Sequence, residues 1–205
     1  MKNKTSTLLS LLGGALCVTF ASNAWANHRS GDFPLPEIMT AGDFNRDGNL
    51  DLAVNMSGFD NFVVLNGDGV GGFTIKRHIA VDTLTKAVVS GDVHGDGFID
   101  AVSVSQWGYN ITVFLGNGAG DFRLSKVLNG DGEPRRVLLA DLNKDGNLDI
   151  IANAPSEGKI HIYFGLGGGN FTNTALDLEK YSNVFAIQVG AFNGEPNPDI
   201  ALDYF

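Results

Sequence analysis

A repeat of 49 residues constrains this chain more than any other feature of its sequence. An acidic stretch, "DFNRDGNLD" at Asp43, returns as "DVHGDGFID" at Asp92 and as "DLNKDGNLD" at Asp141. A glycine-rich stretch that ends in phenylalanine keeps the same spacing: Phe73, Phe122 and Phe171. A fourth, degenerate copy, "AFNGEPNPD", begins at Ala191. A fixed period of this length indicates a repeat architecture, in which each unit buries its apolar face against its neighbours.

Each period contains four short runs that are typical of β-strands. In the second copy these runs are "AVVSGD", "FIDAVSV", "NITVFLG" and "DFRLSKVL", with turn signals between them. After the N-terminal segment, no window of about 15 residues shows a helical period. Four strands in roughly 50 residues are typical of a β-propeller blade. We therefore predict an all-β fold, a β-propeller of four-stranded blades that span residues 36–84, 85–133, 134–182 and, in part, 183–205.

The predicted blades do not close a ring. About three and a half blades are present, whereas known propellers have about four to eight. The chain is therefore expected to be a fragment, to remain an open arc, or to pair with a partner chain that completes the propeller. An open arc exposes a strand edge and an apolar blade face, which favours self-association.

The N-terminal residues 1–26 are predicted to be a secretory signal peptide. A short basic start precedes the apolar run 8–20, and "AWA" at 24–26 fits a cleavage site. The alternative, a membrane anchor, is disfavoured because the run is too short for a comfortable span. The only cysteine, Cys17, lies in this segment, so disulfides are not expected after cleavage. We predict a secreted or periplasmic protein in which residues 27–35 form an N-terminal segment before the blades.

The overall composition limits the function. The 205 residues carry a net charge of −9, and 43% of them are hydrophobic, which fits one globular domain. The negative charge argues against nucleic acid as a partner, because phosphates would be repelled.

The acidic stretches resemble the calcium loops of FG-GAP/VCBS repeats, which are known from integrin alpha subunits and from secreted bacterial proteins. The third copy also keeps "NAP" at Asn153–Pro155 and "FG" at Phe164–Gly165. The resemblance covers about residues 36–205. It implies a propeller, usually of about seven blades, with calcium bound in the loops between first and second strands.

The spacing of oxygen ligands in these loops agrees with calcium. Calcium takes about six to eight oxygens; a tight loop can supply side chains from its first, third and fifth residues, a carbonyl from the seventh and a carboxylate from the ninth. Glycine at the sixth position permits the turn. In the first loop the predicted ligands are Asp43, Asn45, Asp47, Asn49 and Asp51. In the third loop they are Asp141, Asn143, Asp145, Asn147 and Asp149.

The second and fourth loops are poorer candidates. The second offers Asp92, Asp96, the carbonyl of Phe98, and Asp100. Its third position is His94, and because imidazole is a poor calcium ligand, we expect weak binding with a water in its place. The fourth loop has Ala191 first and lacks the glycine, so no full site is expected.

Two alternatives to these calcium loops stay open. The first alternative is an EF-hand or dockerin loop, which needs an acid at its twelfth position. In the three copies that position is occupied by Val54, Ser103 and Ala152, none of which is acidic. Asx-turns without metal are the second alternative. If calcium binds, we expect it to be structural, because no open position for a substrate is suggested.

No catalytic motif is present, so we predict a non-enzymatic binding or adhesion module with a carbohydrate or protein ligand. Exposed aromatic residues at Phe59, Trp107 and Tyr109 could stack on sugars; the alternative is that they cover a blade edge. Charged residues just before each predicted first strand, Glu37, Lys86 and Arg135, could ring the mouth of the central channel and hold an anionic ligand, or form an ordinary solvated rim. An accessory, non-catalytic propeller of a secreted polysaccharide-degrading enzyme is the rival hypothesis, and a degenerate product without independent function is the third.

Overall fold

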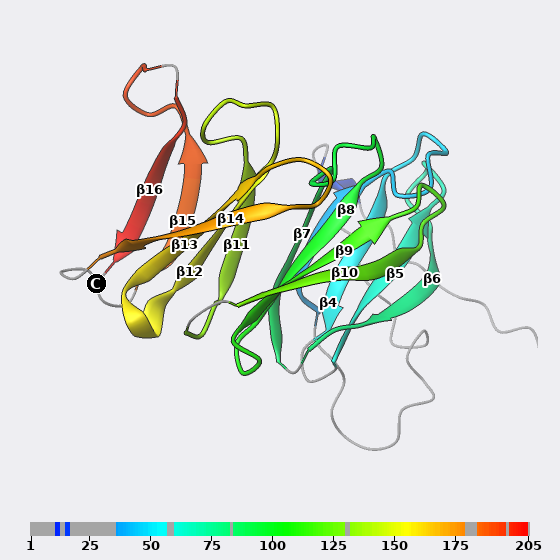
Figure 1. Cartoon of the computed structure of the whole chain (residues 1–205). Helices are drawn as coiled ribbons and strands as arrows, with labels where there is room; N and C mark the ends of the chain where they lie inside the picture. The colour runs from blue at the N-terminus through cyan, green and yellow to red at the C-terminus, as the bar shows by residue number, and fades with distance from the viewer. Residues whose placement is uncertain are drawn as a thin grey trace, which may run out of the picture.

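A four-stranded antiparallel sheet is the repeating unit of the fold, as the 49-residue period predicts (Figure 1). The computed structural model describes residues 11–12, 15–16, 36–56, 60–82, 84–129, 132–178, 184–195 and 197–204. In each sheet the strands pair in the order in which they follow along the chain. This simple meander is the blade of a propeller.

The strands form three complete blades and one partial blade. Blade 1 contains β3 (Pro36–Gly42), β4 (Asp51–Met56), β5 (Asn61–Gly67) and β6 (Phe73–Ala80). Blade 2 contains β7 (Thr85–Gly91), β8 (Asp100–Ser105), β9 (Asn110–Gly116) and β10 (Phe122–Asn129). Blade 3 contains β11 (Arg136–Ala140), β12 (Asp149–Ala154), the short 3-10 helix η2 (Pro155–Glu157), β13 (Lys159–Gly165) and β14 (Phe171–Asp177). The partial blade 4 contains β15 (Val184–Gly190) and β16 (Asp199–Tyr204). The prediction of about three and a half four-stranded blades is confirmed.

The predicted signal peptide contains one described feature. Two strands of two residues, β1 (Leu11–Leu12) and β2 (Ala15–Leu16), pair with each other there. The rest of residues 1–26 and the segment 27–35 lie outside the described residues, so the signal peptide stays a prediction. In the described part of the chain, no helix has the length and the apolar character that crossing a bilayer requires.

The second strand of each complete blade is buried on both faces. All six residues of β4, of β8 and of β12 are buried, which explains why these strands are nearly continuous apolar or small runs. The outermost strands are mostly exposed, with polar residues along β6, β10 and β14. Burial therefore falls from the inside of each blade to its outer edge.

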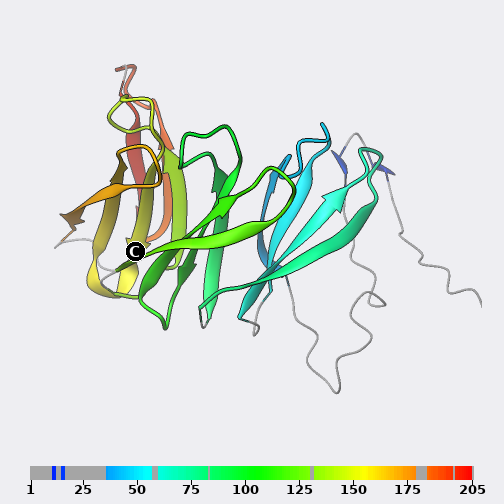
Figure 2. The ribbon, with the colours of Figure 1, turned by 45° about the vertical axis from the view of Figure 1, so that its right-hand side comes forward.

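The core is divided into layers between successive blades. Between blades 1 and 2, Phe62 packs edge-on against Phe114 and Phe122, with ring centroids 5.5 and 5.9 Å apart. Between blades 2 and 3, Val102 and Val104 belong to one cluster with residues of β11 and β12. A third layer joins blade 3 to β15 and β16. The first strands β3, β7, β11 and β15 contact one another in sequence, so the blades stand side by side (Figures 1 and 2).

Candidate metal centre

The acidic loops join the first and second strands of the blades, as predicted. They lie at the same end of the sheets as the glycine-rich turns between third and fourth strands (Figure 1). The two kinds of loop touch across neighbouring blades. The amide of Gly120 donates to the carbonyl of Phe44 at 2.9 Å, and the amide of Gly168 donates to the carbonyl of His94 at 2.8 Å. Each of these two acidic loops is therefore supported by the glycine turn of the next blade.

The first position of the first and third loops organises the turn. In the first loop, Oδ1 of Asp43 accepts the amide of Asp47 at 3.1 Å, and its Oδ2 accepts the amide of Gly48 at 2.9 Å. In the third loop, Asp141 accepts the amides of Asp145 and Gly146 at 3.1 and 2.9 Å. The repeated sequence thus produces one repeated geometry.

The third and fifth positions continue this network in the first loop. Asn45 accepts the amide of Asp47 through Oδ1 at 2.9 Å and donates from Nδ2 to Oδ2 of Asp47 at 2.9 Å. The amide of Asn49 donates to Oδ1 of Asp47 at 2.8 Å. This amide, followed by the Asn45 side chain, lowers the pKa of Asp47 below its ordinary value of 3.8. Asp47 is therefore an exposed, ionised carboxylate.

The third loop repeats these contacts. The side-chain amide of Asn143 donates to Oδ2 of Asp145 at 2.9 Å, and the backbone amide of Asn147 donates to Oδ1 of Asp145 at 2.8 Å. The pKa of Asp145 is lowered by the Asn147 amide first and by Asn143 second. The sixth residues, Gly48 and Gly146, have φ of 87° and 90°, a left-handed conformation that favours glycine.

The ninth aspartate has a different environment from the other predicted ligands. Asp51 is fully buried; its Oδ2 accepts the amide of Phe44 at 3.0 Å, and its Oδ1 accepts the amide of Gly67 at 2.9 Å. Asp149 is also fully buried and accepts the amides of Leu142 and Gly165, each at 2.8 Å. The ninth aspartate therefore ties the loop to the end of the third strand.

The glycine at the end of the third strand is a structural residue that the sequence analysis did not identify. A Cβ atom on Gly67 would lie 2.1 Å from the carbonyl oxygen of Leu50, so no other residue fits without a shift of the backbone. In blades 2 and 3 the corresponding distances are 2.1 Å at Gly116 and 2.4 Å at Gly165. The sequence feature that could have identified this glycine is its constant separation of 16 residues from the ninth aspartate.

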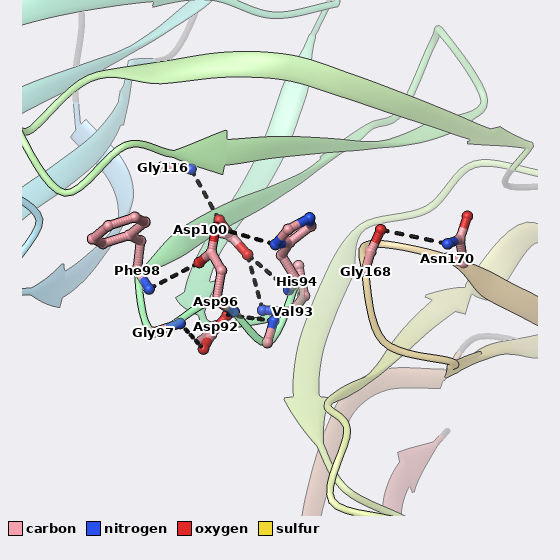
Figure 3. Close-up of polar contacts among 11 residues, drawn as sticks. Asp92, Val93, His94, Asp96, Gly97, Phe98, Asp100, Gly116, Gly168 and Asn170 are labelled. Atoms are coloured by element: carbon pink, nitrogen blue, oxygen red, sulfur yellow. Dashed lines mark hydrogen bonds and ion pairs between the residues drawn. The ribbon is translucent and has the colours of Figure 1, made fainter.

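The second loop departs from this pattern at its third position (Figure 3). Nδ1 of His94 lies 3.1 Å from Oδ2 of Asp96, where the other loops have an asparagine amide. Asp92 accepts the amides of Gly95 and Gly97 at 2.6 and 2.8 Å. The amide of Phe98 donates to Oδ1 of Asp96 at 3.0 Å. His94 therefore competes with any cation for the fifth-position carboxylate.

Asp100 closes the second loop and accepts three amides. Its Oδ2 accepts from Val93 and His94 at 3.0 and 2.9 Å, and its Oδ1 accepts from Gly116 at 2.9 Å (Figure 3). Burial raises the pKa of Asp100 despite these bonds, and repulsion from Asp96 and Asp92 adds to the increase. Burial likewise raises the pKa of Asp149, with repulsion from Asp145 and Asp141. The carboxylates of one loop are therefore close enough to repel one another.

The fourth loop keeps the closing aspartate and the asparagine at the third position, whose Oδ1 accepts the amide of Glu195 at 2.8 Å. Asp199 accepts the amides of Phe192 and Asn193 at 2.9 and 3.2 Å, as Asp100 accepts those of Val93 and His94 in the second loop. Ala191 has no side-chain oxygen at the first position. In the described part of this loop, the ninth aspartate thus still binds backbone amides, which we call the anchor, but there is no carboxylate at the first position.

The first and third loops each bring together two carboxylates and an amide oxygen, which are ligand types that calcium takes. Each carboxylate has about four lone-pair sites, so the first and fifth aspartates keep acceptor capacity beyond the amides they bind. However, within the described ranges of the chain, no three His, Cys, Asp or Glu side chains are grouped so as to hold one metal ion. The third ligand is an asparagine, and the ninth carboxylate already accepts two amides. The loop oxygens therefore fit calcium through two carboxylates, an amide oxygen and backbone carbonyls, with the ninth aspartate in a mainly structural role.

The other residues predicted for function have mixed placements. Trp107 and Tyr109 lie in the β8–β9 hairpin and are 63% and 49% exposed. Lys86 lies within β7 rather than before it, and Arg135 precedes β11 directly. The side chain of Glu37 and all of Phe59 lie outside the described residues.

Comparisons with known proteins agree with the fold and with the repeat. A family model described as FG-GAP-like repeat matches residues 92–152 and again residues 141–202. A structure described as the crystal structure of BBS1N in complex with ARL6DN, soaked with lead, aligns with a TM-score of 0.57 and 15% identity. That alignment covers 85% of this chain and 51% of the BBS1N chain, so the present chain spans about half the length of that structure. At this identity the likeness concerns the fold alone. No curated protein gave a significant match.

The family assignment follows from these matches together with the loop geometry. The two matched ranges run from the second acidic loop to β16, which is more than half of the chain. Each range contains acidic loops that are closed by a buried or half-buried aspartate bonded to backbone amides. The chain belongs to the family of FG-GAP-like repeat proteins.

Proposed function

We propose that this chain is a secreted or periplasmic, calcium-binding propeller module that acts in binding or adhesion and is not an enzyme. One observation carries the metal part of the proposal. The first and third loops, 98 residues apart from Asp43 to Asp141, adopt the same hydrogen-bonded turn around an exposed pair of carboxylates and an asparagine oxygen. Clustered acids repel one another in water, and a divalent cation converts this repulsion into attraction.

The residues that would hold calcium are those of the two matching loops. In the first loop they are Asp43, Asn45, Asp47 and the carbonyl of Asn49, supported by Asp51. In the third loop they are Asp141, Asn143, Asp145 and the carbonyl of Asn147, supported by Asp149. The second loop would bind more weakly, because His94 interacts with Asp96 and offers no oxygen.

Bound calcium would act as a structural staple rather than as a catalyst. It would hold together the loop between the first and second strands of a blade. Disulfides cannot take this role, because none is expected after cleavage. Extracellular calcium modules have dissociation constants of about 10⁻⁴–10⁻³ M and are saturated outside the cell. This range suits a secreted or periplasmic protein that folds fully after export.

The ligand would bind to loops at the blade ends, for which a carbohydrate or a protein is proposed. The exposed Trp107 and Tyr109 support this part of the proposal, because aromatic faces stack on sugar rings and anchor protein interfaces. Tyr109 has φ of 52°, an uncommon backbone conformation for a bulky residue. Strained positions of this kind cluster at binding sites.

The test for the metal is calorimetric titration with calcium together with thermal unfolding in calcium and in excess chelator. We expect about two strong sites and a melting temperature several degrees higher in calcium, with magnesium at the same concentration as the control. A melting temperature that is the same in calcium and in chelator would contradict the metal proposal.

A glycan and protein array with the wild type and Trp107→Ala tests the ligand. We expect selective binding that this substitution abolishes, without turnover of the bound glycan. Release of products from a polysaccharide would instead contradict the non-enzymatic role.

A further inference from the structure

The hairpin between β8 and β9 carries two aromatic residues that do not pack in the core. Because β8 begins at the second acidic loop, this hairpin lies at the opposite end of blade 2. Trp107 and Tyr109 are 63% and 49% exposed. In the described chain, neither is part of the four clusters of buried apolar side chains. Their aromatic surface therefore contributes little to the packing of the blades.

The hairpin of blade 3 has small residues at the same positions of the repeat. Ser156 lies 49 residues after Trp107, and Gly158 lies 49 residues after Tyr109. Gly158 has φ of 61° and Tyr109 has φ of 52°, so both hairpins need a left-handed residue at this point. Glycine adopts this conformation freely, whereas a bulky residue is strained in it. Stability alone would favour glycine in both hairpins, and a strained residue with an exposed side chain indicates a binding role.

The turn that presents the two aromatic residues is held firmly by the preceding connection. The amide of Gly108 donates to Oγ of Ser105 at 3.0 Å. A Cβ atom on Gly108 would lie 2.4 Å from Oδ2 of Asp82, so the turn rests directly on that carboxylate. Nδ2 of Asn110 donates to the same oxygen at 2.6 Å. Because the turn is already fixed, a ligand that binds to it loses little affinity to ordering of the loop.

Three polar side chains lie beside the hairpin tip. Nε2 of Gln106, the residue directly before Trp107, donates to Oε2 of Glu133 at 2.7 Å. Nη2 of Arg135 lies 3.5 Å from the same oxygen. The side chains of Glu133 and Arg135 are 29% and 44% exposed, and both residues belong to the connection between β10 and β11. An amide, a carboxylate and a guanidinium are thus grouped next to an exposed aromatic surface.

This combination matches the chemistry of a sugar ring. One face of a pyranose is lined by C–H groups and stacks on an aromatic ring, and its hydroxyl groups both donate and accept hydrogen bonds. A carboxylate has about four lone-pair sites and a guanidinium has about five N–H donors. Glu133 and Arg135 therefore keep hydrogen-bonding capacity beyond their mutual contact. Aromatic surface with a few placed polar groups is the usual composition of a ligand site.

The charges and the size of the site favour a neutral sugar over an acidic one or a protein. Glu133 and Arg135 compensate each other, so this pair offers no free cation to a uronate or a sulfate, and the whole chain has a net charge of −9. Two aromatic side chains offer at most roughly 500 Å². That area falls short of the roughly 800 Å² per partner of a specific protein interface, but it suffices for one or two sugar rings.

We propose that the tip of the β8–β9 hairpin, together with Gln106, Glu133 and Arg135, is a binding subsite for a neutral, hydroxyl-rich glycan. This inference rests on the proposed binding function and narrows its ligand to one chemical class. Trp107 and Tyr109 supply the stacking surface, and the three polar side chains bind hydroxyl groups. The subsite is separate from the acidic loops, which lie at the other end of the blade.

Fluorescence titration of the full chain tests the subsite. In a Trp25→Phe background Trp107 is the only tryptophan, so its emission reports directly on the hairpin. The probes are neutral hexasaccharides of β-1,4-linked glucose, xylose, mannose and N-acetylglucosamine, with hexagalacturonic acid as the charged comparison. We expect at least one neutral probe to bind and to change the emission, and hexagalacturonic acid not to bind.

The variant Tyr109→Gly separates binding from folding. It removes one aromatic face and relieves the strained backbone, so we expect the affinity for the neutral probe to fall at least about tenfold while the melting temperature does not fall. Phe192→Ala is the matched control, because Phe192 is 60% exposed in the fourth loop, and it should keep the affinity of the parent chain. Glu133→Gln leaves the charge of Arg135 uncompensated and should allow hexagalacturonic acid to bind.

The outcomes distinguish this inference from the proposed function on which it rests. A Tyr109→Gly variant that keeps the affinity of its parent, or a parent chain that binds hexagalacturonic acid as tightly as the neutral probes, overturns the inference. If no neutral hexasaccharide binds but a protein on the array binds in a manner that depends on Trp107, the inference falls and the binding function stands. If neither a glycan nor a protein binds, both fall.

Discussion

The first and fourth acidic loops are copies of the same repeat, but the residues at their first, fifth and sixth positions differ. The first loop has carboxylates at positions one, five and nine, whereas the fourth has Ala191 at position one and Pro196 in place of glycine. Even so, Asp199 in the fourth loop accepts the amide of the second loop residue, Phe192, just as Asp51 accepts the amide of Phe44 in the first. The contact of the ninth aspartate with its own loop has been retained where the first-position ligand has been lost.

This difference separates two roles that one motif combines. The ninth aspartate stabilises the blade through hydrogen bonds to the backbone, whether or not a metal binds. The first, third and fifth residues shape an exposed turn around two carboxylates and an asparagine side chain. The loops therefore contain a structural anchor and, where the exposed positions are kept, a candidate calcium site.

The largest effect should come from removing an anchor. Asp51→Ala leaves the buried amides of Phe44 and Gly67 without an acceptor, and each unsatisfied group costs about 1–3 kcal/mol. We expect a loss of about 4 kcal/mol in the free energy of unfolding, equal in calcium and in chelator. Urea denaturation in both buffers measures it.

The exposed position of the same loop supplies the control for the anchor. Asp43→Ala should have less than half the effect of Asp51→Ala in chelator, because the amides it bonds are exposed. If the two substitutions cost the same without metal, the distinction between anchor and metal site fails.

The glycine that meets the anchor should come second in effect. Gly67→Ala places a methyl group 2.1 Å from the carbonyl of Leu50, and such overpacking costs about 1–3 kcal/mol. Gly48 lies in the loop with φ of 87°, and a Cβ atom there would have nothing within 4 Å, so only its backbone conformation restricts substitution. Asparagine tolerates that conformation. We therefore expect thermal unfolding to show Gly48→Asn as mild and Gly67→Asn as severe; equal losses would contradict the close-approach explanation.

The third effect concerns the exposed carboxylates and depends on calcium. Asp141→Ala with Asp145→Ala should remove the calcium-dependent stabilisation of the third loop, about 1.4–2.7 kcal/mol at ten to a hundred times the dissociation constant. Chemical denaturation with and without calcium measures this loss. The matched control is Asn193→Ala with Glu195→Ala in the fourth loop, which should not change the calcium dependence. Because the first loop would still bind calcium, part of the response should remain; a response as large as that of the wild type would show that the third loop holds no calcium.

Much of the fold could be predicted from the sequence, because a 49-residue period with four apolar runs leaves few alternatives. The anchor could not be predicted in the same way. In the sequence, a carboxylate at the ninth position of the loop resembles a metal ligand. Only the fold shows that Asp51 accepts the amide of Gly67 and that Asp149 accepts the amide of Gly165. The exposure of Met39 also needed the structure, since Met39 differs from Val88, its counterpart in blade 2, far more in exposure than in chemical character.

The smallest predicted effect is a difference in how the ninth and the fifth aspartate change the free energy of unfolding with pH. Burial, with added repulsion from Asp145 and Asp141, raises the pKa of Asp149 above its ordinary value of 3.8. Between pH 3.8 and the raised pKa, the folded protein keeps a proton that the unfolded chain has released, so stability falls as the pH rises through this window. The pH effect of Asp145 has the opposite sign, because hydrogen bonds lower its pKa. Its contribution to the free energy of unfolding is present above pH 3.8 and is lost as the pH falls below that value.

Asp149→Asn and Asp145→Asn should therefore alter different parts of the stability profile. In chelator, and after subtraction of a constant offset for lost hydrogen bonds, Asp149→Asn should remove the decline in stability that this group causes between pH 3.8 and its raised pKa. Asp145→Asn should leave that range unchanged and alter only the acid limb. Urea denaturation across pH measures both. Two variants with the same stability profile above pH 3.8 would mean that the ninth aspartate is no more buried in solution than the fifth, and the separation of anchor from metal site would lose its electrostatic basis.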